Sequence, residues 1–370
     1  EFARSVVDRL GTKSLVTIAV VGATWDAIKG GHVDGLYGTI VMAAVAELMG
    51  CDVDREQIAM LSTNPLAPNI RLTEPCTSWW HVQAGDRCMD LEAGLIGFDF
   101  RRVPDVDHSQ DPPSPSSKAE ADQWLKDCYC KPYAGPIAEA LAAGKTVVIP
   151  REWDWSKGNG WYGWGVIVEV ADDGTILGAC LNKRSDNVLR TAGDAVILSP
   201  AAATLSGHDA DVKMLDRGLH RIRGDAEPFL PTKTLVFGIA AMDAWIDHMS
   251  STRGFCRECF QRAPERAWTD ANDNAVMTRD GALLASSYLR GRLADFDVAS
   301  RGHLESLAAR YDRIAQLLAR AITGEGGLHY RDFIGDLAKQ KEHAQTVLTP
   351  VRQELVAAAD DIERALSAME

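Results

Sequence analysis

The feature that most constrains the fold is a change to helical periodicity after Pro228 and Pro231. From there on, apolar residues recur every three or four positions, as they do on one face of an amphipathic helix. The clearest stripe has seven members: Leu304, Leu307, Ala308, Tyr311, Ile314, Ala315 and Leu318. A helix that is apolar on one side has to pack against another element. The spacing therefore predicts a helical domain over residues 231–370.

The expected helices of this domain run over residues 235–249, 276–293, 304–318 and 331–368. We expect Pro350 to bend the last of them, because proline has no N–H to donate to the helical hydrogen-bond pattern. One-sided apolar stripes also permit a homodimer that forms through the C-terminal helices.

The first part of the chain mixes short helices with β-branched runs, which is typical of an α+β domain. Residues 145–150 read KTVVIP, a strand pattern, and residues 165–181 contain two β runs around Asp172-Asp173-Gly174. Asp-Gly between two such runs is a strong hairpin signal. Single cores stop growing near about 250–300 residues, so the chain is expected to form two domains, 1–230 and 231–370.

Charge and hydropathy exclude two classes of partner. The net charge of −13 repels phosphate backbones and anionic lipid, so neither nucleic acid nor a membrane surface is expected as a partner. No run approaches the ~20 apolar residues of a membrane span, and residues 14–23 lack the flanks of a secretory signal. We therefore expect a cytoplasmic protein, and we interpret Glu1 in place of Met as a processed or trimmed N-terminus.

The 8 cysteines leave three alternatives open. They are too few in a chain of this length for a dense disulfide framework, so free thiols are one interpretation. Disulfides of an exported protein are the second. The third is a zinc site built from the pairs Cys128/Cys130 and Cys256/Cys259, which requires four ligands to converge from two domains. Because no nucleotide-binding or metalloprotease motif is present, we expect neither a cofactor nor a metal.

Reactive side chains are concentrated in residues 71–81. Cys76 and His81 can form a thiol–imidazole pair in which His81 acts as the base. Arg71 offers a bidentate guanidinium that suits a carboxylate or phosphate group. The alternatives are a Cys76 that packs in the core or bonds to Cys88, a His81 that hydrogen-bonds a carbonyl, and an Arg71 in a salt bridge.

Tryptophans gather in two segments of the first half of the chain. Six of the 10 lie there: Trp79, Trp80, Trp153, Trp155, Trp161 and Trp164. Indoles flanked by glycine can line a pocket for a sugar, a flat ring or a cationic amine, and they can also cap a core where loops cross. We expect Trp79, Trp80, Trp161 and Trp164 to form the walls of a small-molecule pocket.

A helix is expected to begin at residues 34–39. The carboxylate of Asp34 can cap the free amides of its first turn, and it can also contact a ligand. Tyr37 can donate a proton or hydrogen-bond a ligand. Both residues are therefore candidates for the same pocket.

Several short motifs resemble those of a known family. Residues 142–149 read AAGKTVVI, residues 162–170 read YGWGVIVEV, and the predicted hairpin follows; residues 36–38 and 69–71 add to the likeness. This order resembles the butirosin-biosynthesis-H-like proteins, which have a papain-like fold of the kind seen in C39 peptidases. The resemblance implies a papain-like α+β domain over residues 1–230.

The chain departs from that family where the catalytic residues would stand. A papain-like enzyme carries its nucleophilic Cys at the start of a core helix and its His at the start of a strand. Here those positions hold residues 36–38 (LYG) and 164–165 (WG). We therefore expect a non-standard acyltransferase or amide hydrolase with Cys76 as nucleophile, His81 as base and Tyr37 as a further catalytic group. The alternative is a catalytically silent protein that binds a small molecule or a partner through the aromatic cleft.

Overall fold

The computed structural model describes residues 55–63, 65–71, 89–103, isolated positions from 112 to 127, 131–149, 165–174, 176–180, 196–225, 235–250, 264–323 and 336–369. These residues belong to two compact units. The first unit takes Arg55 and the described residues from Glu92 to Ser206, and the second takes those from Glu56 to Leu91 and from Gly207 onward. Residue 230, the predicted domain boundary, lies outside the described residues.

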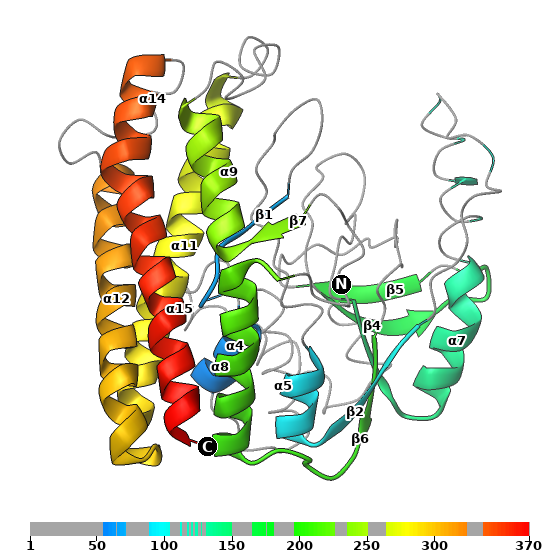
Figure 1. The fold of residues 1–370 in the computed structure, drawn as a ribbon. Coiled ribbons are helices and arrows are strands. Elements are labelled where there is room, and N and C mark those ends of the chain that lie inside the picture. Colours follow the sequence, from blue (N-terminus) through cyan, green and yellow to red (C-terminus); the bar gives the residue numbers. More distant parts are fainter. Residues whose placement is uncertain are drawn as a thin grey trace. The chain divides into compact units, whose positions relative to one another are not determined.

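The first unit contains a five-stranded antiparallel sheet in the order β2-β6-β3-β4-β5 (Figure 1). Its strands are β2 (Phe98–Arg102), β3 (Thr146–Ile149), β4 (Gly165–Val170), β5 (Ile176–Cys180) and β6 (Val196–Pro200). The predicted hairpin is confirmed, since β4 pairs with β5. In the turn, the Gly174 N–H donates to the Ala171 carbonyl at 2.8 Å, and Gly174 has a φ of +78° that favours glycine.

Among the described residues of the first unit, two helices accompany the sheet. Helix α5 (Met89–Ile96) runs into β2, and helix α7 (Lys131–Ala142) packs on β3 and β4. The buried residues of α7 are Tyr133, Ile137 and Ala140, whose spacing places them on one face of the helix.

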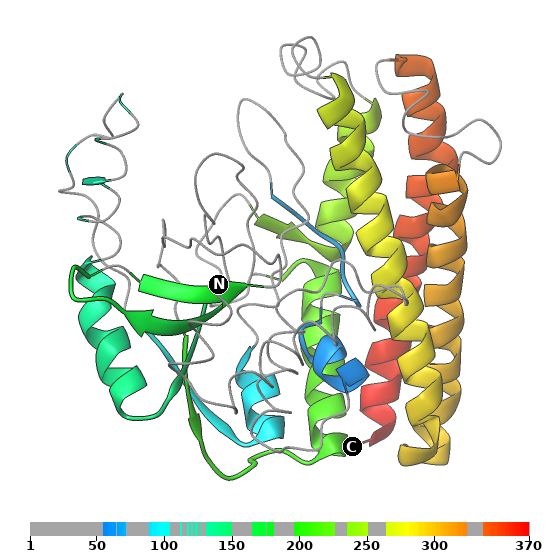
Figure 2. The ribbon, with the colours of Figure 1, turned by 180° about the vertical axis from the view of Figure 1, so that it is seen from behind.

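The second unit is a layer of long helices. They are α8 (Gly207–Arg223), α9 (Gly238–Ser250), α11 (Pro264–Arg292), α12 (Val298–Thr323) and α15 (Thr349–Met369). Helix α12 packs against both α11 and α15 and lies at the outer edge of these helices, and α8 and α9 follow one another along α15 (Figures 1 and 2). The unit also contains α4 (Arg55–Leu61), the 3₁₀ turn η3 (Leu293–Asp295), and the paired strands β1 (Asn69–Arg71) and β7 (Leu235–Phe237).

The predicted apolar stripe forms the buried face of α12. All seven of its residues are buried, and Leu304, Leu307 and Leu318 are fully so. Burial of each leucine side chain contributes about 1.5–3 kcal/mol, which explains why this pattern determines the local fold. In the described part of the chain, no helix has the length and apolar composition needed to cross a bilayer.

The last helix begins later than predicted. Asp336 caps helix α14 (Leu337–His343) by accepting hydrogen bonds from the backbone N–H groups of Ala338 (3.1 Å) and Lys339 (3.2 Å). A π-helical turn, η5 (Ala344–Leu348), joins α14 to α15, so Pro350 falls in the first turn of α15. The backbone stays helical through Thr349 (φ −62°, ψ −45°), so Pro350 lies inside a continuous helix, directly after a π turn that already changes the helical hydrogen-bond pattern.

The predicted papain-like α+β fold of residues 1–230 is wrong. Helices make up most of the described residues, and strands make up a small part. Three elements of this range, α4, β1 and α8, belong to the second unit with the long helices. Helix α8 does so because Ala210, Met214, Leu215, Leu219 and Ile222 form a buried helical stripe, and the helix packs on α15.

Candidate functional site

Arg71 is the single predicted site residue whose backbone the structure describes. It is the last residue of β1, and its Cα pairs with that of Leu235 in β7. The remaining predicted residues lie outside the described residues: Asp34, Tyr37, Cys76, Trp79, Trp80, His81, Trp161 and Trp164. The pairing of Cys76 with His81 and the meeting of the two tryptophan segments therefore stay predictions.

The segment that leads into Arg71 is buried. Residues 57–63 and 65–68 are all buried, and Ile58, Leu61 and Leu66 have no exposed surface. Connecting segments normally run over the surface, because a buried carbonyl needs a hydrogen-bond donor that water can no longer supply. The buried carbonyls of this segment must find their donors in the protein.

Three hydrogen-bond donors from different elements bind carbonyl oxygens of this segment. The bonds run from Arg221 Nη1 to the Ser62 carbonyl (2.9 Å), from the Tyr311 hydroxyl to the Leu66 carbonyl (2.8 Å), and from the Gly238 N–H to the Pro68 carbonyl (2.7 Å). We call these three donors and three carbonyls the carbonyl clasp. The clasp fixes the chain over the residues that precede β1.

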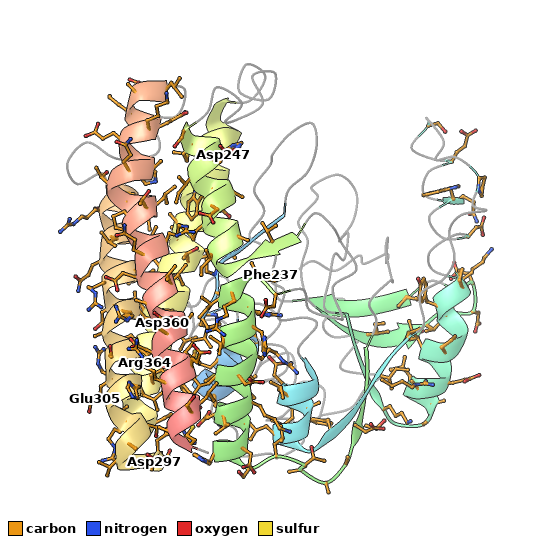
Figure 3. The ribbon with its side chains drawn as sticks, in the orientation of Figure 1. Phe237, Asp247, Asp297, Glu305, Asp360 and Arg364 are labelled. Atoms are coloured by element: carbon orange, nitrogen blue, oxygen red, sulfur yellow. The ribbon has the colours of Figure 1, made fainter. Side chains whose placement is uncertain are left out.

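Arg221 of α8 has no exposed surface. Besides the bond to Ser62, its guanidinium lies over the ring of Phe237, 5.2 Å from the centroid; Phe237 is labelled in Figure 3. A buried cation is costly unless dipoles and aromatic faces replace its hydration shell. Arg221 therefore depends on both the Ser62 carbonyl and β7, and it connects the buried segment to the β1–β7 ribbon.

Tyr311 of α12 is the second donor of the clasp, and it is 1% exposed. Burial raises the pKa of Tyr311, so its hydroxyl keeps its proton over the whole physiological pH range. In the clasp the hydroxyl acts as a neutral donor toward Leu66. Its role there is to hold the backbone.

The backbone around the clasp is strained. Thr63 has a φ of +57°, a conformation that is costly for a β-branched residue. Gly238 has a φ of +55°, and a Cβ there would lie 2.2 Å from the Ile222 carbonyl oxygen. Strained conformations persist where the surrounding structure imposes them, and they cluster at functional sites. The strain at Thr63 marks this segment as a candidate site.

A second polar cluster in the helical unit is centred on Asp211 of α8, which is 1% exposed. The carboxylate accepts hydrogen bonds from Gln57 Nε2 (2.9 Å), from Arg292 Nε (2.9 Å) and from the Tyr288 hydroxyl. Three of its roughly four lone-pair sites are thus occupied by protein donors. The cluster is suited to joining α4, α8 and α11, and it leaves little capacity for a substrate.

Sequence patterns could not reveal either cluster. The partners of Asp211 are 77 to 154 positions away in the chain, and Tyr311 is 245 positions from Leu66. Hydrophobic periodicity places Tyr311 in the core, but it cannot identify the carbonyl that its hydroxyl meets.

The tryptophan-rich residues 150–164 connect two strand ends that lie together, since Ile149 of β3 pairs with Gly165 of β4. Trp164 directly precedes β4. The two strand ends that flank these residues therefore lie side by side.

Of the histidines that the structure describes, two are buried, and both lie in the helical unit. Desolvation lowers the pKa of His248 in α9 and of His343 in α14 to about 3, so both rings are neutral at pH 7. Neutral imidazole is the metal-binding form of histidine. Among the described residues, however, no group of three or more His, Cys, Asp or Glu side chains is arranged to hold a metal ion.

Comparison of the sequence with models of known protein families and with curated proteins finds no match.

Proposed function

We propose that the chain is a thiol enzyme that transfers or hydrolyses an acyl group of a small molecule, with Cys76 as its nucleophile. The observation that supports this most is the carbonyl clasp, which anchors the chain immediately before β1 and Arg71. Cys76 follows Arg71 by five positions. A reactive group needs a fixed attachment, because catalysis depends on accurate orientation of the reacting atoms.

The proposed reaction has two steps. His81 accepts the proton of the Cys76 thiol, the sulfur attacks the carbonyl carbon of an amide or ester, and the leaving amine or alcohol takes the proton from His81. This gives a thioester on Cys76. An acceptor amine, an alcohol or water then loses a proton to His81 and attacks the thioester carbon; the carbon–sulfur bond breaks, and the sulfur regains the proton.

The other predicted residues supply binding. Arg71 is proposed to hold a carboxylate or phosphate group of the substrate, because its guanidinium can donate two parallel hydrogen bonds. Trp79, Trp80, Trp161 and Trp164 are proposed as the walls of the pocket, and Asp34 and Tyr37 as polar contacts to the ligand. The motifs that resemble those of the butirosin-biosynthesis-H-like proteins are the support that the sequence gives for acyl transfer.

We propose further that the enzyme is cytoplasmic, that its partner is a small-molecule substrate, and that it forms a homodimer through the C-terminal helices. The net charge of −13 supports the absence of nucleic-acid partners. Sedimentation equilibrium tests the dimer: a single species of 40.2 kDa would contradict it.

Alkylation by iodoacetamide tests the enzyme. The rate at Cys76, measured by mass spectrometry between pH 5 and pH 10, is expected to be rapid and to show an apparent pKa below the ordinary thiol value of about 8.5. Cys76→Ser should abolish the rapid phase. The matched control is Cys180→Ser, because Cys180 lies in β5 paired with Gly165, and its loss should leave the rapid phase intact.

A second candidate is a catalytically silent protein that binds a small molecule through its aromatic segments. The observation that favours it is the pairing of Ile149 with Gly165, which brings together the two strand ends that flank the tryptophan-rich residues 150–164. Under this alternative Cys76 would react as slowly as a buried thiol at all pH values, and the rapid phase would be missing.

A further inference from the structure

Helices α14 and α15 are joined by a turn that holds one residue more than an α turn. The backbone is helical on both sides of η5, at His343 and at Thr349. At its end the Thr349 N–H donates to the Ala344 carbonyl, five residues back, whereas in an α-helix it would donate to the carbonyl of residue 345. The two helices are therefore one helix with a one-residue irregularity.

Two adjacent residues favour the π turn. Pro350 has no N–H, and in a regular α-helix its ring would clash with the carbonyl of residue 346. The Thr349 hydroxyl donates to the Ala344 carbonyl at 2.8 Å, again five residues back. By contrast, the Thr346 hydroxyl donates to the Glu342 carbonyl, four residues back (2.7 Å), which is the usual bond of threonine in an α-helix. The Thr349 bond is thus specific to the π turn.

The buried face of the helix changes its neighbour at η5. Helix α15 packs mostly on α12, α14 packs on α9, and η5 contacts both α9 and α12. In an unbroken α-helix the buried residues would share one face, because they recur every three or four positions. They are Gln340, Ala344, Val347, Val351, Leu355, Ala358, Ile362 and Ala365. One extra residue turns α14 by about 100° relative to α15, which accounts for the change of neighbour.

We propose that η5 is a two-position joint that sets which face of α14 packs on α9. In the π position, which the structure shows, Gln340 and His343 are buried, whereas Lys341 and Glu342 are exposed. If η5 becomes an α turn, each residue of α14 moves to the place of the residue before it. In this α position Lys341 replaces Gln340, and His343 replaces Glu342 at the surface.

Two opposing preferences make such a joint possible. Regular helical hydrogen bonding favours the α position, since π turns are rare and occur mainly as single turns within α-helices. Pro350 and the Thr349 hydroxyl oppose it, and so does the cost of burying the charge of Lys341 against α9. The joint therefore controls the exposure of the His343 imidazole.

The first test compares two threonine variants. Thr349→Val removes the bond that is specific to the π turn, and Thr346→Val removes the ordinary bond to Glu342. The measurement is the rate at which diethyl pyrocarbonate modifies His343, resolved by mass spectrometry. We expect slow modification in the wild type and in Thr346→Val. In Thr349→Val we expect a rate about fivefold higher, which is the change in population that the loss of one hydrogen bond produces.

The second test removes the proline and then the extra residue. Pro350→Ala removes the ring that opposes the α turn, so His343 should be modified faster than in the wild type. Deletion of the exposed Gln345 in the Pro350→Ala chain leaves an α turn with one residue fewer, which returns every residue of α14 to its present place. We expect this double variant to modify His343 as slowly as the wild type.

Each outcome supports or overturns the joint. Equal rates at His343 in the wild type, Thr349→Val and Pro350→Ala overturn it. An equal rise in Thr346→Val also overturns it, because it would show a general loosening of the helix. If deletion of Gln345 does not restore the slow rate, the extra residue does not set the face of α14. The threonine pair gives the result if Pro350→Ala fails to fold, and no measurement depends on the proposed thiol chemistry.

Discussion

His248 and His343 make the stability of the helical unit depend on pH. Burial lowers the pKa of both to about 3 in the folded chain, and the unfolded value is near 6.5. Between these values the unfolded state binds more protons than the folded state. Each histidine therefore contributes stability that is complete above pH 6.5 and is lost as the pH falls toward 3.

We predict that His343→Gln weakens this dependence. Between pH 3 and pH 6.5, each of the two histidines changes the unfolding equilibrium constant by about tenfold per pH unit. The variant has one titrating histidine fewer, so its equilibrium constant should change about tenfold less per pH unit than that of the wild type. Urea denaturation at pH 4, 5 and 6 measures it. His220→Gln is the control, because His220 is 58% exposed; a wild-type slope in His343→Gln would contradict the burial of this ring.

Neighbouring aspartates of α15 provide a second prediction at this scale. Asp361 is buried and accepts hydrogen bonds from Ser306 (2.8 Å) and from Arg310, whereas Asp360 is exposed; Asp360 is labelled in Figure 3. Asp361→Asn leaves the charge of Arg310 without its main partner. Because Arg310 is 23% exposed, water replaces part of the lost interaction, and we expect the free energy of unfolding to fall by about 1–3 kcal/mol.

Asp360→Asn is the matched control and should change the free energy of unfolding by less than about 0.5 kcal/mol. Denaturation in guanidinium chloride measures both variants. If both substitutions lower the free energy of unfolding by the same amount, the ion pair of Asp361 with Arg310 contributes no more to stability than an exposed ion pair does.

At the scale of elements, alanine is expected to have opposite effects on stability at two glycines of the helical unit. Gly291 lies in α11 with nothing within 4 Å of an added Cβ, and alanine there should stabilise the chain by about 0.5–1 kcal/mol. At Gly238, where α9 begins, a Cβ would lie 2.2 Å from the Ile222 carbonyl and φ is +55°. We predict that Gly238→Ala costs about 2–4 kcal/mol.

Thermal and chemical denaturation of the two glycine variants give the comparison. Opposite signs are expected. A neutral Gly238→Ala would mean that α9 can begin without the close approach to the end of α8.

The elements themselves show what local patterns can and cannot predict. The stripe of α12 and the hairpin of β4 and β5 were predictable, because each depends on spacing or turn chemistry within about twenty residues. Strand β7 was not, since Leu235–Phe237 reads as the start of a helix. It becomes a strand through its pairing with Asn69–Arg71, far away in the chain.

The whole fold exposes the limit of motif resemblance. Residues 142–149 and 162–170 predicted β3 and β4 correctly, yet the papain-like assignment built on them was wrong. Short motifs of β-branched residues predict strands, but they do not determine how strands and helices are ordered. The same holds for the site: charged Arg221 and Asp211 read as surface residues in a pattern and lie in the core.

The second unit is discontinuous in sequence, and this determines how it should behave when it is cut. Residues 57–68 bury Ile58, Leu61 and Leu66 among helices that begin at Gly207. Without them, Arg221 loses the Ser62 carbonyl, and Gly218 loses the contact with Leu66, whose Cδ1 would lie 2.4 Å from an added Cβ. A fragment of residues 207–370 would expose the apolar core face that Ile58, Leu61 and Leu66 cover in the full chain.

We therefore predict that the fragment 207–370 alone melts at a lower temperature than the full chain, and that a synthetic peptide of residues 55–71 raises its melting temperature in a concentration-dependent manner. A ligand that binds only the folded state stabilises it by mass action, about 2.7 kcal/mol at one hundred times its dissociation constant. A peptide with Leu66→Asp is the control and should have no effect, because a carboxylate cannot enter the space beside Gly218. If the fragment melts at the same temperature with and without the native peptide, residues 55–71 do not contribute to the stability of the core of the helical unit.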